Sequence, residues 1–201
     1  MKNVLVLFAL FALFASCSSD PRVTRVDARA QTDLSGYWND TDVRIVCETL
    51  INDCLSSPRV AQAIAAKGGG RLPVVLVGSF RNESSEHIDT AIISSTMEVT
   101  IFNSGKLDFV AGGGTRLELR EERQDQQTNA SEATASALAN ETGADFLLTG
   151  TVRTIVDRAG NQTVRTYFVY AEMTNIETNM RMWMAQNSDI KKVIVQPRYR
   201  L

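Results

Sequence analysis

Residue types that often act in catalysis or bind metals, such as histidine and cysteine, are scarce in this chain. Its 201 residues include one histidine, three cysteines and four prolines. The lone His87 and the well-separated Cys47 and Cys54 offer no zinc-ligand spacing. The glycine runs at 68–70 and 112–114 lack the lysine and the hydroxyl residue of a phosphate-binding loop. We therefore expect no catalytic residues, no metal and no cofactor, and a protein that is not an enzyme.

An excess of one charge sign is also missing. Lys and Arg number 21 and Asp and Glu 23, which gives a formal net charge of −2. A slightly acidic chain lacks the basic footprint of a nucleic-acid-binding protein. The longest apolar run, Val4–Ala15, is much shorter than the roughly 20 residues that a membrane-spanning helix needs. We expect neither a nucleic-acid partner nor a spanning helix.

This apolar run has the layout of a secretory signal. Lys2 precedes it, and the small residues Ala15 and Ser16 close it. The pattern predicts export, with residues 1–16 as a signal peptide that is removed. The alternative is an ordinary signal peptide that is cleaved elsewhere.

The end of the leader resembles the lipobox of bacterial lipoproteins. Phe14-Ala15-Ser16-Cys17 matches that motif, except that leucine is usual where Phe14 stands. The resemblance implies lipidation of Cys17 by diacylglycerol and a further acyl chain such as palmitate. Several acyl chains make such an anchor effectively permanent. Ser18 after the cysteine implies the outer membrane, with the domain facing the periplasm.

The rest of the chain divides into a tether and one domain. Residues 17–35 are polar and are expected to form the lipidated N-terminus and a flexible tether, whereas residues 36–201 are expected to form a single globular αβ domain. Cys47 and Cys54 fall on one predicted helix. Seven residues of helix rise by about 10.5 Å, beyond the roughly 7 Å that a disulfide spans. We favour two buried thiols over a bridge formed by unwinding the helix end.

Helix and strand signals alternate in the first half of this domain. Caps, apolar periodicity and glycine stops define the elements. They are a helix from Asn39 or Asp40 to Leu55, a helix from Ser57-Pro58 to Ile64, a strand over 74–80 that is buried on both faces, a helix through Ile93, Met97 and Ile101 that Gly105 closes, and a strand over 107–110. The strand, helix and strand predict a crossover and a parallel pair.

The second half turns from helix to strand. The charged stretch 116–127 is expected to be mostly helical, and Asn129 is expected to cap an alanine-rich helix that ends at Gly143. Three β-rich runs follow, at 146–155, 164–173 and 180–185, and their short turn-rich links predict an antiparallel meander. The fold class is therefore α/β (α+β), a mixed sheet with helices packed on it.

The last β-rich run alternates methionines with Arg181 and Trp183. A strand period of two puts Met180, Met182 and Met184 on one face and the other two residues on the opposite face. A methionine stripe favours core packing under helices, with a cofactor pocket as the alternative. Arg181 and Trp183 would then face outward, although core packing of Trp183 stays open.

Several of these segments together resemble the LpoB family. They are Trp38 before the first helix, the strand 74–77 with its loop 81–84, the segment 104–110, and the segment 137–146 that leads into the meander. LpoB proteins are lipoprotein activators of penicillin-binding proteins and are related in fold to the N-terminal domain of TolB. The resemblance covers about residues 37–190. One departure is the short tether with its single Pro21, since enterobacterial members carry a long proline-rich linker.

The resemblance implies a non-catalytic partner-binding role. The domain would dock on a class A, bifunctional penicillin-binding protein, which is a peptidoglycan synthase, and raise its activity, thereby regulating cell-wall synthesis and cell shape. No small-molecule substrate is implied. Polar loops and exposed aromatics are common in interfaces. On that ground Arg81, Asn82, Glu83, Arg181 and Trp183 are the candidate partner-binding residues.

Two other functions are alternatives. The first is a structural or assembly lipoprotein of the same fold, which resembles the curli-secretion lipoproteins and would form an oligomer at the outer membrane. The second is an envelope hydrolase with paired carboxylates. Ser84, Ser85 and His87 are neighbours in the sequence, but no nucleophile elbow and no orienting acid accompany them.

Overall fold

The computed structural model describes residues 23–67, 70–110, 112–129 and 143–197. The chain divides into two compact units, Met1–Ala30 and Gln31–Leu201. In the first unit the Asp27 carbonyl accepts a hydrogen bond from Ala30 N at 3.0 Å and closes a turn. Within the described ranges no helix combines the length and the apolar character needed to cross a bilayer. The predicted signal peptide, lipobox and Cys17 lie outside these ranges, and the border between tether and domain stays a prediction.

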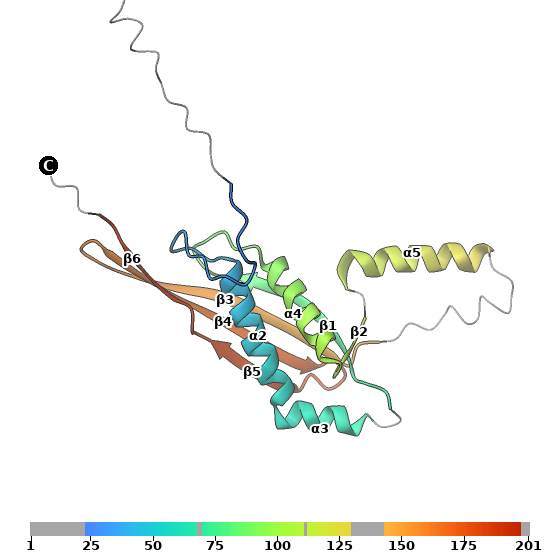
Figure 1. The fold of residues 1–201 in the computed structure, drawn as a ribbon. Helices are drawn as coiled ribbons and strands as arrows, with labels where there is room; N and C mark the ends of the chain where they lie inside the picture. The colour runs from blue at the N-terminus through green and yellow to red at the C-terminus, as the bar shows by residue number, and fades with distance from the viewer. Residues whose placement is uncertain (1–22, 68–69, 111, 130–142, 198–201) are drawn as a thin grey trace, which may run out of the picture. The chain divides into compact units, whose positions relative to one another are not determined.

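A mixed sheet organises the second unit (Figure 1). Its described elements are α2 (Asp40–Ser56), α3 (Pro58–Ala66), β1 (Val74–Asn82), α4 (Thr90–Ser104), β2 (Asp108–Phe109), α5 (Gly113–Asn129), β3 (Phe146–Ala159), β4 (Gln162–Asn175), β5 (Arg181–Asn187) and β6 (Lys191–Val195). The strand order is β2-β1-β3-β4-β5, and β6 pairs with β4. β1 runs parallel to β2 and β3, whereas β3, β4 and β5 are antiparallel. The predicted α/β (α+β) class, with its parallel crossover pair and antiparallel meander, is confirmed.

Local sequence signals start and stop the two helices that cover the sheet. The Asn39 side chain accepts a hydrogen bond from Asp42 N at 3.1 Å, and the Asp42 carboxylate accepts one from Asn39 N at 2.9 Å. This capping box satisfies backbone donors that α2 itself leaves free. α4 begins after Asp89, which accepts from Ala91 N, and ends at Gly105, where φ is 64°. That left-handed conformation favours glycine. The predicted caps at Asn39 and Gly105 are confirmed.

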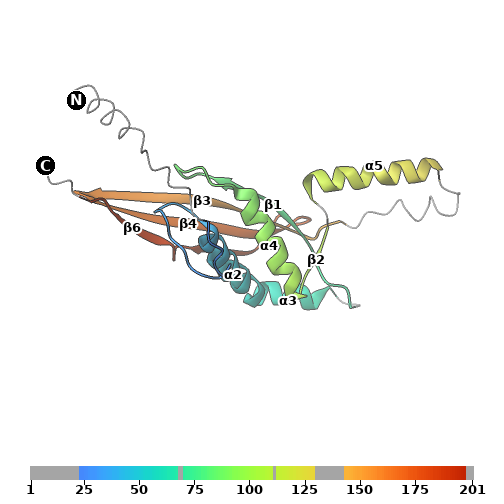
Figure 2. The same cartoon turned by 45° about the horizontal axis from the view of Figure 1, so that its top comes forward.

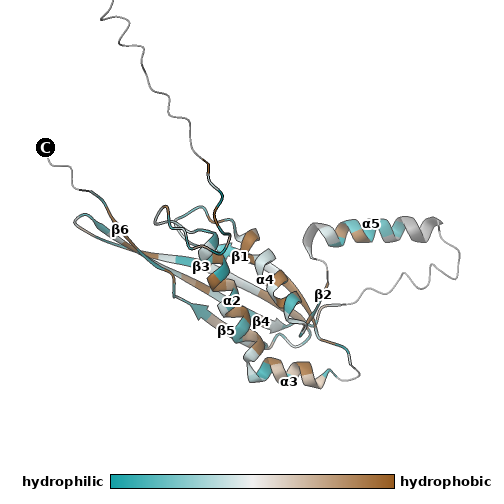
Figure 3. Ribbon diagram, in the orientation of Figure 1, coloured by the Kyte–Doolittle hydropathy of each residue, from teal (hydrophilic) through white to brown (hydrophobic). Residues whose placement is uncertain are grey.

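Helices α2 and α4 pack against the same face of the sheet (Figures 1 and 2). Apolar residues are frequent in these helices and in the strands behind them, whereas α5 is mostly hydrophilic (Figure 3). Cys47 and Cys54 are buried free thiols in this core, as predicted. The large and fully buried side chains include those of Leu50, Ile51, Ile93, Met97, Ile101, Leu148, Tyr167 and Met173.

The structure reverses the face assignment predicted for β5, which also contains a β-bulge. The register between β4 and β5 shifts next to the pair Met173–Trp183, and Met182 is the extra residue. Trp183 pairs with the buried Met173 and is only 7% exposed, so it faces the helix-covered side, whereas Met184 is exposed. The bulge puts Arg181 on the face opposite to Trp183, although the two were predicted to share a face. The predicted outward Trp183 and buried methionine stripe are wrong, and core packing of Trp183 holds. Arg181 is exposed, as predicted.

Two further predictions need correction, one lies outside the described residues, and one strand was missed. The strand at 74–80 is paired on both edges at its start, but Leu76 and Gly78 are only half-buried, because no described helix covers their side of the sheet. Asn129 is the last described residue of α5, so this helix runs past the predicted end at Gln127, since residues 115–128 contain no glycine or proline to stop it. The alanine-rich helix expected after it falls on 130–142, outside the described residues. The strand β6 was not predicted.

Candidate interaction surface

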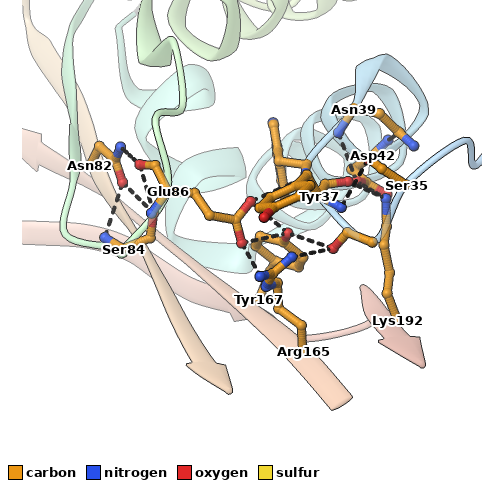
Figure 4. Close-up of polar contacts among 12 residues, drawn as sticks. Ser35, Tyr37, Asn39, Asp42, Asn82, Ser84, Glu86, Arg165, Tyr167 and Lys192 are labelled. Atoms are coloured by element: carbon orange, nitrogen blue, oxygen red, sulfur yellow. Dashed lines mark hydrogen bonds and ion pairs between the residues drawn. The ribbon is translucent and has the colours of Figure 1, made fainter. Parts of the chain in front are cut away.

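A buried ion pair fastens the segment that leads into the domain (Figure 4). Arg165 Nε on β4 lies 2.8 Å from Glu86 Oε1, and the two side chains are 9% and 6% exposed. Arg165 Nη1 also donates to the Gly36 carbonyl at 2.6 Å, and its guanidinium carbon lies 4.4 Å from the centre of the Tyr37 ring. The Tyr167 hydroxyl is 2.9 Å from both oxygens of Glu86. Burial and the Glu86 carboxylate raise the pKa of Tyr167.

A second contact set holds the same segment from β6. Lys192 Nζ lies 3.0 Å from Asp33 Oδ1 and 2.6 Å from Asp42 Oδ2, and it donates to the Tyr37 carbonyl at 2.8 Å. Hydrogen bonds from Gln31 and from Lys192 lower the pKa of Asp33 to about 2. Burial raises the pKa of Asp42, although Lys192 acts in the opposite direction. These contacts fix where the chain enters the domain.

Asn82 belongs to this structural network. Its Oδ1 accepts hydrogen bonds from the backbone N and the hydroxyl of Ser84, at 3.0 and 2.6 Å, and its Nδ2 donates to the Glu86 carbonyl at 2.7 Å (Figure 4). Such an Asx turn shapes the loop after β1 and so positions Glu86 for Arg165. Asn82 therefore has a positioning role in the structure, and partner binding by it stays a prediction.

The face of the sheet opposite α2 and α4 carries the exposed side chains of β1, β3, β4 and β5. The strand register places Arg81, Thr151 and Tyr170 in one row across this face and Thr149, Glu172 and Met184 in the next. We call it the open face. Met184 and Ile155 expose apolar surface on it, at 59% and 60%.

A shallow hollow of about 250 Å³ lies on the open face. Small residues of β1 and β3 form its floor, because serine, threonine and glycine stand where larger residues would fill it. The taller side chains of Arg81, Tyr170 and Glu172 border it. The residues that line the hollow are Ser79, Arg81, Thr149, Gly150, Thr151, Tyr170 and Glu172.

Ion pairs leave one guanidinium in excess at this hollow. Glu83 Oε2 accepts from Arg153 Nε and Nη2, both at 2.7 Å. Glu172 Oε2 lies 3.0 Å from Arg181 Nε and accepts from the Tyr170 hydroxyl at 2.7 Å. Burial, followed by Glu172, raises the pKa of Tyr170.

Arg81 completes this set of charges. Its Nη2 reaches only the already paired Glu83, at 3.8 Å, and its side chain is 74% exposed. Three arginines and two glutamates thus lie on the open face, which leaves one positive charge in excess among them.

Three of the five predicted partner-binding residues belong to this arrangement. Arg81 and Glu83 lie at the end of β1, and Arg181 lies at the start of β5, across the sheet. Asn82 organises the loop, and Trp183 is buried and donates its indole N–H to Asp53 on α2 at 2.7 Å. Arg81 contacts Glu83 directly, and Arg181 is paired with Glu172, which lines the same hollow as Arg81.

Sequence reasoning missed Arg153, Tyr170, Glu172 and Met184. A signal for part of this set existed. The hairpin turn at Gly160-Asn161 makes Ala159 and Gln162 the first pair of β3 and β4, and the register continues from there along both strands without a shift. Counting outward from that turn pairs Thr151 with Tyr170. The place of Met184 could not be counted in this way, because the β5 bulge interrupts the register.

A second hollow, of about 660 Å³, lies beside α4 and is lined by Val77, Glu98, Val99, Phe102, Asn103, Phe109, Val110, Gly112 and Thr115. Val99 and Phe102 are among the exposed apolar residues of the chain. Neither hollow gathers metal ligands, and no group of three His, Cys, Asp or Glu able to hold a metal occurs among the described residues.

Comparison with known proteins gives one family match. The model of the family described as peptidoglycan-synthase activator LpoB matches residues 42–188. No curated protein matches the chain.

Solved structures of low identity are also similar. The LpoB C-terminal domain from Escherichia coli is 16% identical, with 77% of this chain and 99% of that chain covered and a TM-score of 0.45. The corresponding domain from Salmonella enterica is 15% identical, with the same coverage and a TM-score of 0.43. Lipoprotein GNA1162 from Neisseria meningitidis is 18% identical, with 60% and 83% covered and a TM-score of 0.40.

Proposed function

Because this chain belongs to the LpoB family of peptidoglycan-synthase activators, we propose that its domain binds a bifunctional penicillin-binding protein through the open face and raises that enzyme's activity. The family match carries the proposal. The protein itself performs no catalysis in this scheme. Activation requires only that the domain binds an active conformation of the synthase more tightly than an inactive one.

The character of the open face supports its choice as the docking face. It combines exposed apolar side chains, such as Met184, with the paired arginines and glutamates around the hollow. Rigid strands carry these groups, so little backbone conformational entropy is lost when a partner binds. The opposite face is already occupied by α2 and α4.

The lipid anchor at Cys17 and its outer-membrane location are parts of the proposal. The tether of about 17 residues reaches at most roughly 60 Å when extended. The contacts of Lys192 and Arg165 with residues 33–37 shorten the free part of the tether further. An anchored domain therefore needs a synthase that extends toward the anchor.

A binding and polymerisation experiment tests the proposal. The chain from residue 17, with Cys17→Ser to prevent lipidation, is combined with each bifunctional synthase of its source organism. We expect capture of one synthase and a faster rate of glycan polymerisation in its presence. Absence of both effects with every synthase would refute the activator function.

Two variants of equal exposure locate the docking face. Met184 on the open face and Val99 on α4 are both 59% exposed. A lysine in an interface core is expected to weaken binding by at least about tenfold, which is roughly 1.4 kcal/mol. We expect this loss for Met184→Lys and no change for Val99→Lys. The reverse result would move the docking site to the hollow beside α4.

An oligomeric structural lipoprotein is the second candidate function. The edge strand β6 exposes Val193 and Val195, and exposed apolar edge strands can pair with another chain. Light scattering of the Cys17→Ser chain separates the two functions. A defined oligomer that binds no synthase would favour assembly, and a monomer would count against it.

A further inference from the structure

We infer that the hollow on the open face receives an acidic side chain of the synthase, with Arg81 as its main charge partner. This inference rests on the proposed function and specifies the chemistry of the same surface. It is carried by the lining residues of the hollow and by the ion pairs around it.

The shape of the hollow suits a single side chain from a partner. Its floor is made of short residues on β1 and β3, including Ser79, Thr149 and Thr151. A volume of about 250 Å³ has room for roughly eight waters at about 30 Å³ each. Filling such a depression from the partner side expels that water and provides the packed pocket that interface hot spots occupy.

The charges at the rim select an anion. Glu83 is bound by Arg153, and Glu172 is bound by Arg181 and Tyr170, so both carboxylates are already neutralised. Arg81 keeps an exposed guanidinium with only a long contact of 3.8 Å to Glu83. The rim is thus locally positive, although the whole chain carries a formal charge of −2.

The hydrogen-bonding groups of the hollow complement a carboxylate. A guanidinium presents a planar set of donors that binds both oxygens of a carboxylate at once. Ser79, Thr149 and Thr151 line the floor, and each has a hydroxyl that can act as an additional donor. A cationic side chain would meet Arg81 as a like charge, and an apolar one would leave these donors without partners.

Charge variants measure the contribution of Arg81. We expect Arg81→Glu to weaken synthase binding by at least tenfold and to lower the dependence of binding on salt concentration. Arg81→Lys keeps the charge but loses the two-point geometry, so a loss of about threefold is expected. Arg158→Glu, at the exposed far end of β3, makes the same charge change away from the hollow and is expected to leave binding within twofold.

Hydroxyl variants test the floor independently of charge. Thr149→Val and Thr151→Val keep the side-chain shape and remove a hydroxyl each. We expect severalfold weaker binding from each variant and an unchanged dependence on salt. Circular dichroism of all variants checks that the fold is kept, which the exposure of Arg81 favours.

The outcomes separate this inference from the proposed function. If the unmodified chain binds and Arg81→Glu binds equally well, the acidic-side-chain inference fails while the activator function stands. An equal loss in Arg81→Glu and Arg158→Glu would also overturn it, because the affinity would then depend on the total charge of the domain and not on a contact in the hollow. If Arg81→Glu loses affinity for isolated peptidoglycan and keeps its affinity for the synthase, the hollow binds glycan instead. If the unmodified chain binds no synthase, both proposals fall.

Discussion

Glu86 and Arg165 form an ion pair of 2.8 Å between the loop after β1 and the first part of β4. The pair lies beside the chain segment at Gly36 and Tyr37. Arg165 donates a hydrogen bond to the Gly36 carbonyl, and its guanidinium makes a cation–π contact with the Tyr37 ring. It therefore joins the entry segment, the loop and the sheet. The open face lies on the other side of β4, so the pair supports the domain without contacting a partner there.

Removing one partner of this pair should destabilise the domain strongly. Glu86→Gln leaves Arg165 buried without a counter-charge, and breaking a buried ion pair costs about 3–5 kcal/mol. We expect the free energy of unfolding in urea to fall by about 3 kcal/mol or slightly less, because the amide can still accept hydrogen bonds.

Glu83→Gln is the matched control for this change. Its ion pair with Arg153 has side chains that are 36% and 63% exposed, so solvent screens the attraction. Exposed pairs contribute about 0–1 kcal/mol, and we expect a change in that range. Equal effects of Glu86→Gln and Glu83→Gln would show that the buried pair has no special role in stability.

Local signals explain why most elements could be predicted. The capping box at Asn39, the glycine at position 105 and the turn at Gly160-Asn161 each act over a few residues, and the structure contains all three. The buried thiols followed from helix geometry. In each case the physical cause is contained in a short stretch of sequence.

Long-range packing explains what could not be predicted. β6 is short, begins with two lysines and pairs with the first residues of β4, Gln162–Thr166, and not with its neighbour β5. The bulge at Met182 puts Arg181 and Trp183 on opposite faces, which a strict period of two cannot reveal. The hollow combines residues from three strands, so only the full register places Arg81 near Tyr170.

Alkaline pH should destabilise the domain because three buried groups resist ionisation. Burial raises the pKa of Cys47 and of Cys54 from 9.0 to about 12, and it also raises the pKa of Tyr167. Above pH 9 the unfolded chain loses protons that the folded chain retains, so the stability present below pH 9 declines as the pH rises toward 12. Each group contributes a slope of up to about 1.4 kcal/mol per pH unit.

Urea unfolding under reducing conditions at pH 8, 9, 10 and 11 measures this decline. A variant with both Cys47→Ala and Cys54→Ala starts from a lower stability because it contains cavities. Its stability should nevertheless change much less between pH 9 and 10 than that of the unmodified chain, because in the unfolded chain the thiols, with an ordinary pKa of 9.0, lose their protons before Tyr167, with an ordinary pKa of 10.0. A slope in that interval equal to that of the unmodified chain would contradict the assignment to the thiols.

Trp183 is expected to act through the core and not through the partner. Trp183→Phe keeps an aromatic ring but removes the N–H that binds the Asp53 carboxylate at 2.7 Å. A hydrogen bond to a charged group contributes about 1.5–3 kcal/mol, and the exposure of Asp53 places the expected loss near the lower limit. Synthase affinity should stay within twofold.

A double-mutant cycle checks this contact. Asp53→Ala, Trp183→Phe and their combination are compared by urea unfolding, and a coupling of about 1 kcal/mol is expected between the two residues. Additive effects would show that the hydrogen bond contributes little. A large loss of synthase binding by a stably folded Trp183→Phe variant would return Trp183 to the interface.

Gly150 on β3 lies so close to the Phe80 ring and to the backbone of β4 that a side chain has no room there. A Cβ atom there would lie 2.2 Å from Phe80 Cε1 and 2.3 Å from the Tyr170 carbonyl oxygen. Gly150→Ala should therefore lower the free energy of unfolding by about 3 kcal/mol, at the upper end of the usual cost of overpacking.

Gly143→Ala, where nothing lies within 4 Å of the added atom, is the control and should change stability by less than about 1 kcal/mol. Adding Phe80→Leu to Gly150→Ala should restore little stability, because the clash with the β4 backbone remains. Wild-type stability of Gly150→Ala in urea would mean that the strands separate at this point without cost.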